Sequence, residues 1–321
     1  MSRAGKIALT VVALVVILFL VVAFAFWRYP VEVGMRTESR AIDKAGFTAF
    51  SSALPDGSGE WVGYQAGNGS PLVFLHGAGD HAGAWSEVAP AFKDRYRVIL
   101  LDLPGHGRSA PKDGPLALGT VLQGVEAFLD DQGVSKTKMI LVGHSMGAWI
   151  AMLYAREHPE RVERVIAING GPLRGREDIS LLPRDREEAR KLMALLRDPG
   201  SPPVPDFVLD GIVRYSRHGP IGRLIATAAD MERYLLDGKL GDFRTPVDLV
   251  WGESDRVVDL DYARRMEAQL PAVRLTVLSR CGHVPVRECP AGLTAALTRV
   301  LSEPPPEMRA APAPQAVRRD D

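Results

Sequence analysis

The apolar and polar positions along this chain form two kinds of run, which alternate. Short, mostly apolar runs that end at Gly, Pro or Asp are typical of buried strands, and longer runs with apolar residues three or four positions apart are typical of helices. Strands are expected at 71–77, within 97–107, and at 138–143, 162–170, 245–252 and 273–278. Helices are expected between them, at 83–93, 117–131, 146–157, 260–270 and 291–301. The alternation predicts an α/β fold with a mostly parallel central sheet flanked by helices.

Three segments depart from this alternation. Residues 47–76 contain short strands separated by turn dipeptides, and residues 172–245 contain several prolines and helix-like pieces but no clear strand. The second segment predicts a helical cap inserted into a catalytic domain that spans 45–302. Residues 303–321 are rich in Pro and Ala, which predicts a disordered tail.

The N-terminal part has the strongest apolar signal. Residues 7–27 carry no charge, and at about 1.5 Å per helical residue they can cross a bilayer core of roughly 30 Å. The run is longer than the h-region of a signal peptide, and Trp27, Arg28 and Tyr29 resemble an interfacial anchor, although Ala23-Phe24-Ala25 also resembles a cleavage site. We therefore predict that residues 1–29 are a membrane anchor in contact with the lipid bilayer, followed by a linker over 30–44.

Basic residues flank the apolar run on both sides, so the positive-inside rule does not decide its orientation. The short N-terminal tail favours an exported catalytic domain.

Charge and composition exclude several classes of protein. Lys plus Arg and Asp plus Glu are equal at 39 each, so there is no electrostatic case for nucleic acid as a partner. The sequence has no glycine-rich phosphate loop with lysine and no H-E-x-x-H pattern, so neither a nucleotide cofactor nor a metal is predicted. Two cysteines are too few for a disulfide scaffold.

The candidate chemistry begins at GHSMG (143–147), which lies between an expected strand and an expected helix. A serine on such a turn is exposed as a nucleophile, and glycines two residues away on each side let the backbone turn without side-chain collisions. The motif alone has low specificity, because 31 of the 321 residues are glycine.

Four further motifs occur with GHSMG in a fixed order. They are HGAG (76–79) and DLPGHGRS (102–109) before it, and GESDRVVD (252–259) and GHVPVRECP (282–290) after it. Together the five resemble the α/β-hydrolase superfamily, in its serine-nucleophile branch with a helical cap, over about residues 45–302. With the N-terminal anchor, the chain also resembles membrane-anchored monoacylglycerol lipases of that superfamily.

This resemblance implies roles for particular residues. Ser145 would be the nucleophile, His283 the base that follows the last strand, and Asp255 the acid that orients it, in the expected chain order. Glu253, Asp259 and Asp261 remain rivals for the acid. The backbone N–H groups of Met146 and Ala78 would form an oxyanion hole. We expect Asp102 and the histidines His76, His106 and His144 to be structural.

Cys281 and Cys289 flank His283, eight positions apart. A bridge between them needs Cα atoms within about 4.4–6.8 Å, which spacing alone does not establish. We expect two free thiols that behave as small apolar side chains.

The predicted function is a membrane-anchored serine hydrolase that cleaves a small-molecule carboxylic ester, with a lipid or another apolar ester favoured. The same fold and residues also serve C–C bond hydrolases, amidases and perhydrolases. An alternative of another class is a non-catalytic binding protein, which the intact Ser, Asp and His disfavour.

Overall fold

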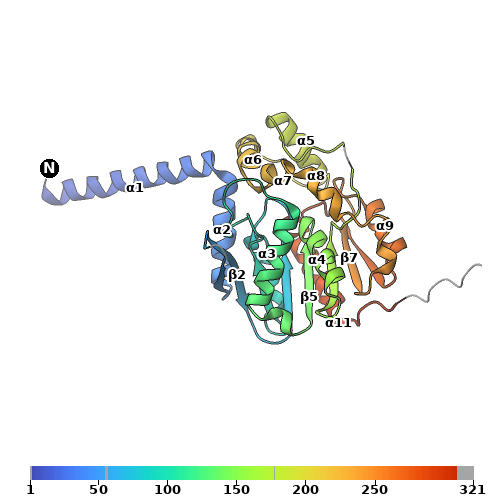
Figure 1. The fold of residues 1–321 in the computed structure, drawn as a ribbon. Coiled ribbons are helices and arrows are strands. Elements are labelled where there is room, and N and C mark those ends of the chain that lie inside the picture. The colour runs from blue at the N-terminus through green and yellow to red at the C-terminus, as the bar shows by residue number, and fades with distance from the viewer. Residues whose placement is uncertain (1, 55–56, 177, 309–321) are drawn as a thin grey trace, which may run out of the picture.

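The computed structural model describes residues 2–54, 57–176 and 178–308. Its centre is an eight-stranded sheet in the order β1-β2-β4-β3-β5-β6-β7-β8. Strand β2 pairs antiparallel with both of its neighbours, β1 and β4, and all the other neighbouring strands pair parallel (Figure 1). The strands are β1 (Thr48–Ala53), β2 (Glu60–Ala66), β3 (Pro71–Leu75), β4 (Arg97–Leu101), β5 (Met139–His144), β6 (Val162–Ile168), β7 (Val247–Gly252) and β8 (Val273–Leu278). The predicted α/β architecture is confirmed.

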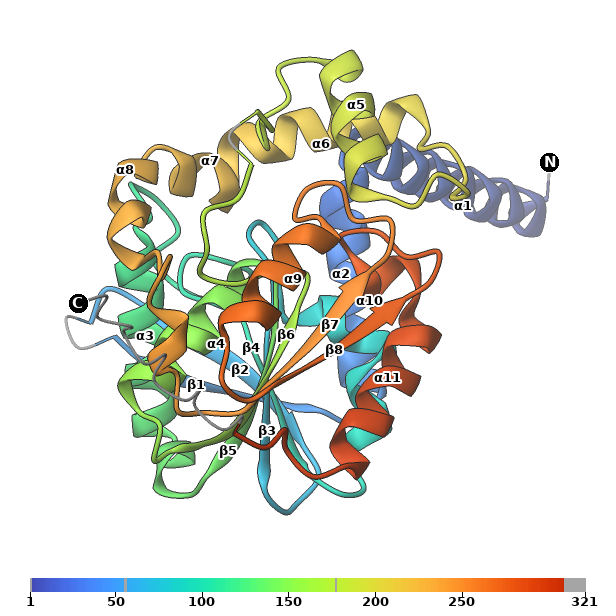
Figure 2. The ribbon, with the colours of Figure 1, turned by 90° about the vertical axis from the view of Figure 1, so that its right-hand side faces the viewer.

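Helices cover both faces of the sheet and create two hydrophobic cores. One core lies under α3 (Leu118–Asp131), α4 (Met146–Glu157) and α9 (Leu260–Gln269), and the other under α2 (Pro30–Lys44), α11 (Pro290–Ser302) and the 3₁₀ helices η1 (Ala82–Glu87) and η2 (Ala89–Phe92) (Figure 2). Strands β3 and β5 are buried at every position, as expected for strands covered on both sides. In place of the helix expected at 83–93, the structure has the two short 3₁₀ helices η1 and η2.

The cap lies above the carboxyl ends of the parallel strands, as both views of the ribbon show. It is helical, as predicted for 172–245. Its elements are α5 (Arg186–Leu196), α6 (Asp206–His218), α7 (Pro220–Ile225), α8 (Ala228–Met231), η4 (Glu232–Tyr234) and η5 (Leu240–Asp242). The remaining short elements are η3 (Val134–Lys136) and α10 (Pro285–Glu288). The tail expected at 303–321 begins directly after α11, and its residues 309–321 lie outside the described part of the chain.

The N-terminal apolar run forms α1 (Arg3–Arg28), which extends away from the domain (Figure 1). The helix is long and apolar enough to cross a membrane, and its most apolar window is not buried against the rest of the chain. Only Tyr29 separates it from α2, which turns and runs along the side of the domain. Residues 30–44, expected as a linker, are thus a helix whose Ile42 is fully buried in a core.

The two cysteines form a disulfide, with Cα atoms 5.9 Å apart. Our expectation of free thiols is wrong. The backbone between them turns through the short helix α10, which brings the two ends of the segment together.

Candidate active site

Ser145 occupies a sharp turn between β5 and α4, with φ 53° and ψ −117°. This backbone conformation is unfavourable for a non-glycine residue and costs of the order of 1–3 kcal/mol. The two glycines of the motif make the turn possible. A Cβ at Gly143 would lie 2.3 Å from the carbonyl oxygen of Gly147, and a Cβ at Gly147 would lie 2.2 Å from that of Leu75. The structure thus supports the predicted reason for both glycines.

The structure brings Ser145, His283 and Asp255 together in one chain of hydrogen bonds. His283 Nδ1 lies 2.7 Å from Asp255 Oδ2, and His283 Nε2 lies 3.1 Å from Ser145 Oγ. An ionised carboxylate only accepts, so Nδ1 carries the proton and Nε2 is free to accept one from the serine. The other oxygen of Asp255 accepts from the backbone N–H groups of Val257 and Val258, both at 2.9 Å. The carboxylate is therefore fixed in direction.

The rivals for the acid have other partners. Asp259 is the N-cap of α9 and accepts from the backbone N–H of Tyr262 at 3.0 Å. Asp261 is exposed and pairs with Arg264. Asp102 accepts from the N–H groups of Ala82 and Arg108, at 2.7 and 2.8 Å, and so braces a loop. Glu253 makes no contact with His283 among the contacts of the described residues.

The loop expected to supply an oxyanion donor runs directly against Ser145. A Cβ on Gly77 would lie 3.3 Å from the Ser145 Cβ, and Ala78 lines the same pocket as the serine. Met146 is the first residue of α4, and the first N–H groups of a helix have no partner within it. Both predicted donors, Ala78 and Met146, therefore lie beside Ser145.

Three buried histidines serve as neutral braces, as expected. His144 Nε2 donates to the carbonyl of His283 at 2.7 Å, and His76 Nε2 accepts from the N–H of Leu103 at 3.0 Å. Burial lowers the pKa of His76 to about 3 and the pKa values of His106 and His144 to about 4. They are uncharged at neutral pH.

Asn169 is a structural residue that the sequence did not reveal. At the end of β6 its Nδ2 donates to the carbonyl of Gly282 at 2.8 Å, and its Oδ1 accepts from the N–H of Gly252 at 2.8 Å. It therefore ties the loop that carries Asp255 to the loop that carries His283. Its left-handed backbone (φ 47°) is a feature that Asn tolerates better than most residues.

A pocket of about 490 Å³ opens above Ser145 between the sheet, the cap and α2. This volume is within the usual range for small-molecule sites. Its lining is mainly apolar. It comprises Pro30, Val31, Gly34, Met35 and Glu38 of α2, residues 77–80, His144, Ser145, Leu181, Leu192, Met193, Leu196, Val208, Ile212, Tyr215, Ser216, Ile221, His283, Val284 and Arg287. The supposed linker thus forms one wall.

Two groups of acidic and histidine side chains lie close enough together to hold a cation. One comprises Glu38, Asp80 and His81, and the other Glu126, Glu157 and His158. In the first, Arg287 already pairs with both carboxylates. The second lies on α3, on α4 and just after it, away from Ser145. The second group therefore lies outside the candidate active site.

A model of the alpha/beta hydrolase family matches residues 72–297. The chain belongs to this family. The matched residues include all of β3 except Pro71, then β4 to β8, the cap and the Ser145, Asp255 and His283 positions. Membership of the family, together with the relatives below, indicates a hydrolase.

Curated relatives and solved structures resemble most of the chain. The 2-hydroxy-6-oxo-6-phenylhexa-2,4-dienoate hydrolase of Burkholderia cepacia is 31% identical over 278 residues, which are 78% of this chain and 92% of the relative. A membrane phospholipase A, described as a bacterial virulence factor, superimposes with a TM-score of 0.73 and 26% identity, over 93% of this chain and 98% of its own. A putative lipase of Acinetobacter baumannii AYE shares the fold, with a TM-score of 0.69 and 20% identity over 83% of this chain and 95% of its own.

Proposed function

We propose that this hydrolase cleaves a carboxylic ester of an apolar or lipid molecule through an acyl-enzyme on Ser145. The observation that carries the proposal is that Ser145 and His283 line an apolar pocket and are hydrogen-bonded to each other, while His283 is also hydrogen-bonded to Asp255. A serine hydroxyl becomes nucleophilic when a base within hydrogen-bond reach takes its proton. His283 Nε2 has the required position, and Asp255 stabilises the imidazolium that forms.

The reaction then follows from these positions. Ser145 Oγ attacks the ester carbonyl carbon while its proton passes to His283 Nε2. The N–H groups of Met146 and Ala78 stabilise the oxyanion, and His283 gives the proton to the departing alcohol. Water, deprotonated by His283, attacks the acyl-enzyme and releases the acid. No step requires a metal or an organic cofactor.

The charge of the pocket favours an ester over the carboxylate substrate named for the dienoate hydrolase relatives. Arg287 is the only Lys or Arg among the described residues that line the pocket, and its guanidinium pairs with both Glu38 and Asp80. The guanidinium is thus committed to these two carboxylates. A substrate carboxylate would find no free Lys or Arg among the described lining residues to pair with.

C–C bond hydrolysis is the second candidate, since the dienoate hydrolase at 31% identity is joined by a 2-hydroxy-6-oxononadienedioate/2-hydroxy-6-oxononatrienedioate hydrolase of Comamonas testosteroni at 30% identity. The two activities separate in one comparison. Full-length protein would be given p-nitrophenyl esters and monoacylglycerols of graded chain length, and in parallel 2-hydroxy-6-oxo-6-phenylhexa-2,4-dienoate, with Ser145→Ala as control. We expect Ser145-dependent ester turnover to exceed dienoate turnover. Ser145-dependent dienoate cleavage without ester hydrolysis would establish the second candidate instead.

We further propose that α1 anchors the enzyme in a bilayer, with the pocket close to the membrane surface. At about 1.5 Å per residue, 26 residues span roughly 39 Å. At the end of α1, Phe26 packs on Phe207 of the cap with ring centroids 5.5 Å apart, and Arg214 of α6 donates to the carbonyl of Arg28. These contacts hold the cap next to the end of the span, where lipids would be available.

The disulfide supports an exported catalytic domain, because such bonds persist in oxidising compartments. We expect the full-length protein to remain with membranes after alkaline carbonate extraction. A mature protein whose chain begins near Phe26 would show that the segment is a cleaved signal and would overturn the anchor.

A further inference from the structure

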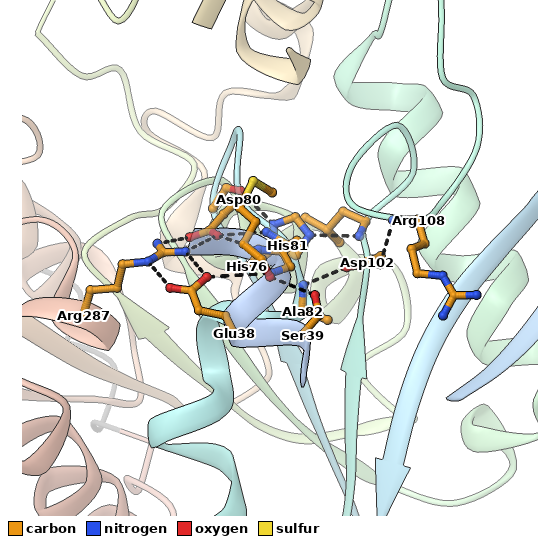
Figure 3. Close-up of polar contacts among 12 residues, drawn as sticks. Glu38, Ser39, His76, Asp80, His81, Ala82, Asp102, Arg108 and Arg287 are labelled. Atoms are coloured by element: carbon orange, nitrogen blue, oxygen red, sulfur yellow. Dashed lines mark hydrogen bonds and ion pairs between the residues drawn. The ribbon is translucent and has the colours of Figure 1, made fainter. Parts of the chain in front are cut away.

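Arg287 makes a two-sided ion pair at the edge of the pocket. Its Nε and Nη2 donate to the two oxygens of Glu38 at 2.7 and 2.9 Å, and its Nη1 and Nη2 donate to the two oxygens of Asp80 at 2.7 Å each (Figure 3). Each carboxylate is therefore held by two parallel hydrogen bonds, a geometry that fixes direction as well as distance. Lysine, which presents a point charge, cannot reproduce this fork.

The three charged residues come from three separate parts of the chain that all meet the active site. Glu38 belongs to α2, the wall of the pocket. Asp80 belongs to the loop after β3, and Arg287 belongs to α10, four residues after His283. The two ion pairs of Arg287 thus join α2, the loop that contains Ala78 and the segment that carries His283, the proposed base.

Asp80 is closely coupled to the position of Ala78. Its backbone N–H donates to the carbonyl of Gly77 at 3.2 Å, which closes a tight turn with Ala78 and Gly79 inside it. Gly79 has φ 76°, a conformation suited to glycine. The side-chain Oδ1 of Asp80 also accepts from the N–H of His81 at 2.9 Å. Movement of the Asp80 carboxylate would therefore move the turn and the direction of the Ala78 N–H.

The same loop has a second tie to α2. His81 Nε2 donates to the carbonyl of Met35 at 3.0 Å, and the next residue, Ala82, donates its N–H to Asp102. Asp80 is largely buried, with 11% of its side chain exposed, and Glu38 has 24% exposed. Burial alone would raise the pKa of the Asp80 carboxyl, but the Arg287 guanidinium lowers it well below its ordinary value. The carboxylate is charged and confined, so removal of its partner leaves a buried charge unpaired.

We propose that Arg287 is a positioning residue for the oxyanion hole: by pairing with Asp80 and Glu38 it holds the turn of residues 77–80, and with it the Ala78 N–H, against Ser145. The inference rests on the proposed function, in which Ala78 is an oxyanion donor. The donor acts on the transition state, so its displacement lowers kcat more than it changes KM.

The test compares kcat and KM for a p-nitrophenyl ester in full-length Arg287→Met, Arg287→Lys and Asp80→Asn. A misplacement of about 1 Å costs on the order of 100-fold in rate. We expect Arg287→Met to lose about that factor in kcat with KM within about threefold, and Arg287→Lys to recover part of the loss. Arg40→Met, at an exposed position of α2, is the matched control and should keep the activity of the unaltered protein.

The double variant Asp80→Asn/Arg287→Met tests whether the two residues act as one unit. We expect its kcat to fall no further than that of the worse single variant, whereas multiplying losses would overturn the proposal. If Arg287→Met does not fold, Asp80→Asn and Glu38→Gln, which keep the size of each side chain, give the same readout.

Two kinds of failure are distinguishable. Unchanged kcat in folded Arg287→Met and Asp80→Asn, or a change in KM alone, would overturn the positioning role while ester hydrolysis through Ser145 stands. If the unaltered protein hydrolyses no ester, or Ser145→Ala hydrolyses esters equally well, the proposed function falls and this inference falls with it.

Discussion

Reduction of the disulfide between Cys281 and Cys289 should destabilise the folded protein by an amount that the loop length predicts. The cysteines are eight positions apart, and they close a loop of about nine residues. In the chain-entropy relation this loop corresponds to about 8.7 cal/mol/K, or about 2.6 kcal/mol at 25 °C. For a domain of this size, 1 kcal/mol corresponds to roughly 2–4 °C in Tm, so we expect reduction to lower Tm by about 5–10 °C.

Reduction is a cleaner perturbation than substitution, because Cys281 is fully buried and a smaller side chain would also leave a cavity. Thermal unfolding would be followed by tryptophan fluorescence with and without a phosphine reductant. Thiol titration of the denatured protein should show no free thiol before reduction and two after it.

The effect on Tm should exceed the effect on kcat. His283 lies inside the loop, but its backbone N–H also donates to the carbonyl of Leu196 at 2.7 Å, and its carbonyl accepts from His144. A fully reduced protein whose Tm stays within about 1 °C of the oxidised value would refute the entropic argument. Two thiols in denatured, unreduced protein would refute the bond itself.

Three further outcomes follow from the site and its surroundings. Asp255→Asn should fold but lose up to roughly 10⁴ in kcat, because the imidazole loses the acceptor that orients it. Asp259→Asn should keep the kcat of the unaltered protein. The reverse result would assign the role of the acid to Asp259. A chain that begins at Tyr29 should hydrolyse esters, and one that begins at Arg36 should lose most activity because it lacks part of the pocket wall; equal activities would show that α2 is dispensable. The free energy of unfolding should fall as pH drops from about 6.5 to about 4, since the unfolded chain binds protons at the three buried neutral histidines and the folded chain does not. A Tm that is constant over that pH range would contradict the last expectation.

His81 should act with the opposite sign. Burial alone would lower the pKa of His81, but its hydrogen bond to Asp80 and the charges of Asp80, Asp102 and Glu38 raise it. Its stabilising contribution is therefore complete below about 6.5 and is lost as the pH rises through the folded value. The loss of stability at acidic pH and this loss at higher pH occur in different pH ranges. A His81→Gln variant should therefore change the pH dependence of stability only in the higher range.

The strands and the Ser145, Asp255 and His283 positions could be predicted because local signals mark them. Apolar runs that end at glycine identify the strands, and each of the three residues follows a strand at the same edge of the sheet. The turn at Ser145 is likewise encoded locally, by Gly143 and Gly147, whose Cβ atoms would collide with nearby backbone.

The features that were missed depend on contacts between distant parts of the chain. Arg287 and Glu38 are 249 positions apart, and the local sequence around either residue does not predict its contact with the other. The disulfide was missed because it depends on how the backbone turns between the cysteines. The helix α2 did carry a signal, since Val31, Met35, Glu38 and Ile42 recur at helical spacing on the side that meets the domain.

Covalent labelling tests whether Ser145 is an activated nucleophile. Full-length protein would be treated with a fluorophosphonate probe, digested and mapped by mass spectrometry, with Ser145→Ala treated in parallel. We expect one adduct, on the peptide that contains Ser145, and none in the alanine variant. An adduct on another residue, or labelling that persists in Ser145→Ala, would contradict it.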